Sequence, residues 1–73
     1  MEPAVAFGRT LRRFRKTAKL TQEQLALEAG VRRTYVSLME LGQNQPTITT
    51  VFKLAKALGC APSTLVRAAE EEC

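Results

Sequence analysis

The sequence contains no histidine, no tryptophan and only two cysteines, and none of its apolar runs is long enough to cross a membrane. Without histidine the chain lacks the commonest general base, and Cys60 and Cys73 are too far apart in sequence to suggest the four clustered ligands of a zinc site. Ser37 and Ser63 fall in predicted helices without a basic partner. We therefore expect no metal, no cofactor and no catalytic site, and predict that the chain is not an enzyme.

The first residues also lack the basic stretch and hydrophobic segment of a signal peptide. We therefore expect a cytoplasmic protein with no membrane contact. In the cytoplasm Cys60 and Cys73 are expected as free thiols, with Cys60 packed or exposed at a helix end; a disulfide between them would be unusual there but stays an alternative.

The 73 residues leave room for one domain, spanning 1–73, with a core from about 5 to 69 and a frayed acidic tail. The net charge is +4, and its distribution is one-sided. The cations of the first predicted helix are Arg9, Arg12, Arg13, Arg15, Lys16 and Lys19, whereas the tail carries Glu70, Glu71 and Glu72. On its own the basic cluster is typical of a solvated helix face, but the asymmetry favours a chain that meets a polyanion with one face.

Helical periodicity and capping residues predict an all-α chain. Phe7, Leu11, Phe14 and Ala18 recur at helical spacing and predict the buried stripe of the first helix. The predicted helices cover about 5–19, 22–29, 32 or 33 to 41, 47 or 49 to 58, and 62–69. On the fourth helix the expected apolar side consists of Ile48, Val51, Phe52, Leu54, Ala55 and Leu58. No strand pattern or internal repeat is present.

Residues 21–42 show the spacing of a helix-turn-helix. Thr21 and Gln24 form a predicted capping box, and Gly30 supplies the left-handed residue of the turn. Counted from Gln22, a small residue stands fifth, glycine ninth, and apolar residues fifteenth and eighteenth: Ala26, Gly30, Val36 and Met39. In this motif the second helix is aimed into the major groove of DNA.

Four consecutive segments carry a family resemblance: LRRFRKTAKLTQEQLALEAG, VRRTYVSLMELG, the asparagine–proline loop and TVFKLAKALGCAPSTLV. Together, over roughly 7–66, they resemble the lambda-repressor-like Cro/CI (Xre) family. The Arg-Thr-Tyr start of the third helix is similar to the controller proteins of restriction–modification systems and to short phage, plasmid and chromosomal Xre regulators.

The resemblance implies a compact five-helix DNA-binding fold and a regulator of transcription. Such a protein would bind double-stranded DNA as a homodimer on a palindromic operator, with half-sites about 34 Å apart, and would often regulate its own gene. The alternative is an antitoxin or another helix-turn-helix protein that binds an unidentified protein partner.

The residues expected to read base edges lie at the start of the third helix and one turn on. Arg33, Thr34 and Leu38 occupy the positions that typically face bases in the family, and Arg32 and Tyr35 are added as neighbours. Arg33 is suited to a bidentate contact with guanine O6 and N7. The competing interpretations are plain surface charge for both arginines and packing against the second helix or the following loop for Tyr35 and Leu38.

Phosphate contacts are expected at the two flanks of the third helix. The resemblance assigns Gln22, at the start of the second helix, and Gln43 and Asn44, in the loop after the third. Thr21 is expected to act as a cap alone. Leu41 departs from the family, which often has a phosphate-binding arginine or asparagine there. Arg12, Arg13, Lys16 and Lys19 are expected to add long-range attraction only.

Two further sets of residues are expected to be structural. In the family the positions of Arg15 and Glu40 form an ion pair that links the first helix to the third. On the fifth helix we assign Leu65 to the core and predict that Val66 and Ala69 form the dimer contact; packing of all three inside the protein is the alternative.

Overall fold

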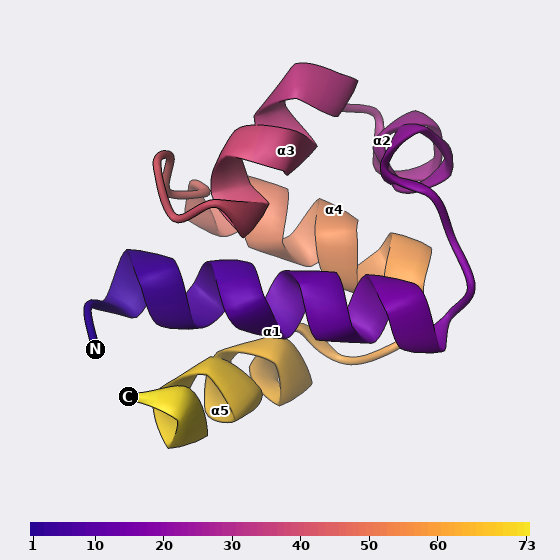
Figure 1. Ribbon diagram of the computed structural model, residues 1–73. Helices are drawn as coiled ribbons and strands as arrows, with labels where there is room; N and C mark the ends of the chain where they lie inside the picture. Colours follow the sequence, from indigo (N-terminus) through magenta and orange to yellow (C-terminus); the bar gives the residue numbers. More distant parts are fainter.

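The computed structural model describes residues 1–73 as five helices without a strand. The helices are α1 (Pro3–Thr17), α2 (Gln22–Ala29), α3 (Arg33–Glu40), α4 (Ile48–Leu58) and α5 (Pro62–Glu72). In Figure 1, α1 crosses the middle of the molecule, α5 lies below it and α3 above it, with α2 seen nearly end-on. The all-α prediction with five helices in this order is confirmed. None of the helices combines the length and the apolarity that a membrane crossing requires.

Interactions between residues close in sequence define both ends of α2. The Gln24 amide N–H donates to Thr21 Oγ1 at 3.0 Å, and the Thr21 N–H donates to Gln24 Oε1 at 2.9 Å. These two bonds form the predicted capping box at the start of α2. Gly30 ends α2 with φ 71°, in the left-handed region that glycine adopts without a steric penalty. Together, the cap and the glycine fix the direction in which the chain enters α3.

One apolar core holds the helices together. Its fully buried side chains come from all five helices: Leu11, Leu25, Val36, Met39, Leu54 and Leu65. The small residues expected between α2 and the rest of the core, Ala26 and Ala29, are also buried. Helix α1 contacts α3 and α5, and α2 contacts α3 and α4. Val36 and Met39 therefore anchor the inner side of α3, leaving its outer side to solvent.

Gly8 allows α1 to approach the last turn of α3 unusually closely. A methyl group at this position would overlap the carbonyl oxygen of Met39 and lie 2.8 Å from that of Glu40. Both neighbours are backbone atoms, which cannot rotate away as a flexible side chain can. The lack of a side chain at residue 8 therefore sets how near α3 lies to α1.

Several sequence predictions are wrong in detail. Helix α1 runs from Pro3 to Thr17 instead of 5–19, so Ala18 is its exposed C-cap and does not belong to the buried stripe. Helix α5 continues past residue 69 to Glu72, so the acidic residues form its last turn. On α4, Ile48 and Phe52 are 69% and 57% exposed. The inner face of α4 is already filled by Val51, Leu54 and Ala55, and no other element covers the opposite side.

The two cysteines are free thiols, so the alternative of a disulfide between them is wrong. Cys60 is half-buried and packs against the core, whereas Cys73 is exposed. Burial raises the pKa of the Cys60 thiol. Because the thiolate is the reactive form, this environment makes Cys60 less reactive than an exposed thiol.

Candidate nucleic-acid interface

The amino-terminal turn of α3 projects polar side chains into solvent. Arg32 is the N-cap, with no side-chain capping bond, and Arg33 and Thr34 begin the helix. All three residues are exposed, and their side chains form no hydrogen bond or ion pair within the protein. Since Val36 and Met39 bury the other side of the helix, the first turn is rigidly held but free to contact a ligand.

Tyr35 and Leu38 are less accessible than their neighbours. Both are half-buried, and the Tyr35 hydroxyl donates to the carbonyl oxygen of Gln45 at 3.2 Å. Tyr35 also packs against the core. The structure thus favours the packing interpretation for Tyr35, which connects α3 to the loop before α4.

The expected ion pair between α1 and α3 is present. Arg15 Nε donates to Glu40 Oε2 at 2.6 Å and Arg15 Nη2 donates to Glu40 Oε1 at 3.0 Å, a two-pronged contact. The side chains are only 11% and 4% exposed. The hydrogen bond to Glu40 raises the pKa of Arg15, against an opposing effect of burial. Arg15 Nη1 also donates to the Leu20 carbonyl at 2.9 Å, so one guanidinium ties α1, the end of α3 and the approach to α2.

Gln22 has a partner that the sequence reasoning missed. Its Nε2 donates to Glu40 Oε1 at 3.0 Å, which joins the start of α2 to the ion pair. The bond uses one of the two N–H donors of the amide, and the backbone N–H groups of Gln22 and Glu23 have no acceptor within the protein, so these donors are left for an anion. A polar residue at the first position of α2, opposite an acid at the end of α3, was the only sequence indication of this bond.

The loop after α3 presents the other expected phosphate contacts. Gln43 and Asn44 are exposed, and neither side chain forms a hydrogen bond in the protein. The Gln43 backbone N–H donates to the Leu38 carbonyl at 2.9 Å, which holds the loop against the last turn of α3. Leu41 is the C-cap of α3 and is 64% exposed. The loop is therefore fixed at its base, and its polar side chains are free.

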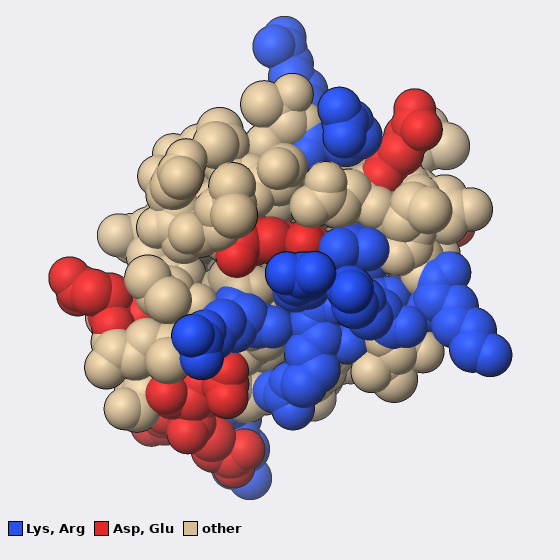
Figure 2. Space-filling model, in the orientation of Figure 1, with Lys and Arg blue, Asp and Glu red and all other residues tan.

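Eight of the eleven lysine and arginine residues lie between residues 9 and 33, and the other three, Lys53, Lys56 and Arg67, lie on α4 and α5. Figure 2, in the orientation of Figure 1, shows a band of lysine and arginine side chains across α1 and a second, separate group at the top, over the start of α3. The acidic side chains gather mainly at the lower left, over the end of α5. A polyanion is therefore attracted to the face that carries α1 and the start of α3 and is repelled by the end of α5.

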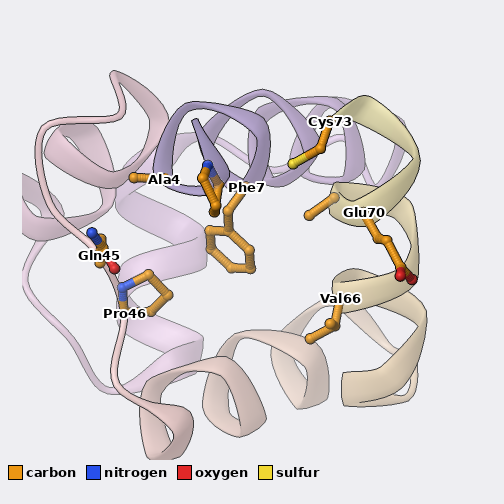
Figure 3. A pocket seen from close by; sticks show the side chains of 9 residues that line it. Ala4, Phe7, Gln45, Pro46, Val66, Glu70 and Cys73 are labelled. Atoms are coloured by element: carbon orange, nitrogen blue, oxygen red, sulfur yellow. The ribbon is translucent and has the colours of Figure 1, made fainter. Parts of the chain in front are cut away.

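An apolar groove lies beside the amino-terminal half of α1. Figure 3 shows Phe7, Pro46 and Val66 around an opening of about 450 Å³, between the start of α1, the loop before α4 and α5. The two residues expected at a dimer contact, Val66 and Ala69, both line it. Val66 is 50% exposed, whereas Ala69 is half-buried and already packs against the core. The groove thus leaves Val66 as the more available of the two.

Comparisons with known proteins place this architecture in context. A helix-turn-helix family, HTH_3, matches residues 11–65. The chain is 36% identical over 61 residues to control protein C.BamHI of Bacillus amyloliquefaciens, covering 82% of this chain and 75% of that protein. It is 40% identical over 58 residues to control protein C.SmaI of Serratia marcescens, covering 78% and 69% of the two chains. The crystal structure of the restriction–modification controller protein C.AhdI of Aeromonas hydrophila superposes with a TM-score of 0.83 and 40% identity, covering 85% of this chain and 94% of that one.

Proposed function

Because the chain belongs to the HTH_3 helix-turn-helix family of DNA-binding transcription regulators, we propose that it binds a palindromic operator as a homodimer with α3 in the major groove. The relatives named control or controller proteins favour a role in regulating a restriction–modification system, including its own gene. A regulator of transcription acts where the DNA is, so we place it in the cytoplasm. We also propose that it has no enzymatic activity, since no residue has the partners of a general base or nucleophile.

The observation that carries this proposal is the free first turn of α3. Arg32, Arg33 and Thr34 project from a helix whose other side is fixed by core residues. The unpaired N–H groups at the start of α2 and the free side chains of Gln43 and Asn44 flank this turn. Base-reading groups between two sets of phosphate-binding groups are the arrangement that a helix-turn-helix needs on DNA.

Selection from a pool of random duplexes tests sequence-specific binding directly. We expect enrichment of a palindromic site, and a large preference for that duplex over a scrambled one that persists at raised salt. Equal binding to both duplexes with a steep salt dependence would contradict the proposal, because phosphate attraction alone produces that result. The search would then turn to a protein partner.

Replacing Arg33 with alanine is expected to weaken binding to the selected duplex by about 1–3 kcal/mol and to relax the preference at one base pair of each half-site. The reason is the loss of two parallel hydrogen bonds to a guanine. Fluorescence-anisotropy titrations against duplexes with each base pair changed in turn measure both effects. Arg67→Ala, which removes an exposed arginine on α5, is the matched control. A uniform loss of affinity over all duplexes would assign Arg33 to phosphate instead.

We propose an apolar strip on α4 and α5 as the dimer surface, extending the expected contact at Val66 and Ala69. Ile48 and Phe52 stand one turn apart on α4, and Pro62 and Val66 one turn apart on α5. Phe52 and Pro62 line one shared hollow, together with Thr49, Lys53, Lys56 and Cys60, so the apolar residues of the two helices lie near each other. Three large side chains of the strip are at least half exposed, more than isolated surface apolar residues explain.

Val66→Asp is expected to shift the protein from dimer to monomer, because it places a charge within the apolar strip. Sedimentation equilibrium measures the change, and binding to the palindromic duplex should weaken in parallel. Leu27→Asp is the matched control, since Leu27 is 82% exposed on α2, away from the strip. If the two variants have the same dimer dissociation constant, the strip is not the dimer surface.

A further inference from the structure

A hollow of about 230 Å³ opens where α1, the start of α2 and the end of α3 meet. Its walls are formed by Arg12, Arg15, Gln22, Ser37, Glu40 and Leu41. Three charged residues line it, two guanidinium groups and one carboxylate, so its net charge is positive. The hollow therefore favours an anion over a cation.

Two of the three charged side chains in the hollow are paired with each other, and the third has no partner. Arg15 and Glu40 neutralise each other in a nearly buried pair, and Glu40 also accepts from Gln22. Arg12 is exposed and forms neither a hydrogen bond nor an ion pair. The free positive charge of the hollow is thus the Arg12 guanidinium.

A further hydrogen-bond donor for a phosphate lies close to Arg12. Gln22 belongs to the wall, and its backbone N–H is one of the two unpaired donors at the amino end of α2. A guanidinium close to a helix amino end adds its charge to that of the helix dipole, and both attract a phosphate. The side chain of Leu41, on the α3 side of the hollow, carries no negative charge that would repel the anion.

We propose that Arg12 binds a backbone phosphate of the operator in this hollow. This inference rests on the proposed function and goes beyond it, because it makes Arg12 a discrete contact instead of one of several long-range charges. Arg13, the next residue, does not line the hollow, and its guanidinium lies 5.5 Å from the centre of the Phe14 ring. The two neighbouring arginines therefore differ in role although they carry the same charge.

The test compares Arg12→Ala with Arg13→Ala on the duplex recovered by selection. Affinity is measured by fluorescence anisotropy over a range of salt concentrations, and circular dichroism checks the fold. For Arg12→Ala we expect binding about tenfold weaker and a salt slope lower by about 1, the value for one lost phosphate contact. For Arg13→Ala we expect a clearly smaller change of slope.

A second variant tests the place of the contact. Because Leu41 lines the same hollow, Leu41→Arg in the Arg12→Ala background should return a cation to it and restore the slope. Equal slopes for the two alanine variants, or no recovery of the slope in the double variant Arg12→Ala/Leu41→Arg, would overturn the inference while the preference of the unmodified protein for its operator stood. If the unmodified protein shows no preference for any duplex, the proposed function fails as well.

Discussion

Glu40→Ala is expected to lower the free energy of unfolding by about 3–5 kcal/mol, the range for removing one partner of a buried ion pair. The carboxylate is 4% exposed and accepts from both Arg15 and Gln22. Its removal leaves the Arg15 guanidinium nearly cut off from water and without its partner, and an arginine side chain cannot escape this by losing its proton at any ordinary pH. Urea denaturation followed by circular dichroism gives the difference directly.

The control for this experiment is Glu28→Ala, which removes an exposed and unpaired glutamate from α2 and should change stability by less than about 0.5 kcal/mol. The double variant Arg15→Met/Glu40→Met is expected to be more stable than either single methionine variant, because no buried charge is left without a partner. Equal losses for Glu40→Ala and Glu28→Ala would mean that the pair is worth no more than a surface contact.

Gly8→Ala is expected to destabilise the protein by about 3 kcal/mol, at the upper end of what overpacking costs. The added methyl group would overlap the Met39 carbonyl oxygen and crowd that of Glu40, so α1 and α3 must move apart. The sign of the change in stability distinguishes a close contact between α1 and α3 from an unobstructed helix. In an unobstructed helix the same change stabilises by about 1 kcal/mol, because alanine is the better helix former.

Thermal and urea unfolding of Gly8→Ala should be compared with those of Gly59→Ala. Gly59 has open space around its Cα but a φ of 74°, so alanine there is expected to cost about 1–2 kcal/mol through backbone strain alone. An increase in stability for Gly8→Ala would show that the two helices are not in backbone contact. Since Gly8 and Glu40 act on the same end of α3, the effects of Gly8→Ala and Glu40→Ala should not be additive.

The helix ends of this fold were predictable from the sequence where residues close in sequence determine them. Thr21 and Gln24 cap α2 through neighbouring atoms, and Gly30 provides the left-handed turn residue, so neither feature depends on distant parts of the chain. The ion pair of Arg15 and Glu40 joins residues that are distant in sequence. It was expected only through the family resemblance, because spacing alone does not pair residues on different helices.

Features that depend on how helices meet were not predictable from the sequence. Gly8 looks like any glycine in a helix until α3 is placed against it. The exposure of Phe52 was missed because apolar periodicity marks an amphipathic helix but does not say how wide its covered face is. The bond from Gln22 to Glu40 has the same cause, since it forms only once α2 and α3 are packed. The base-reading roles of Arg32, Arg33, Thr34 and Leu38 stay predictions.

Two contacts with α1 meet the last turn of α3, where Gly8 admits the backbone of α1 and Arg15 holds Glu40. The residues proposed to read DNA stand at the other end, and eight helical residues span about 12 Å. A substitution in α1 that shifts these contacts is therefore expected to tilt α3 about residues 39–40. A tilt of about 10° there moves the opposite end by about 2 Å, enough to separate a side chain from its base. Operator preference in this protein can therefore change through substitutions in α1 that never touch DNA.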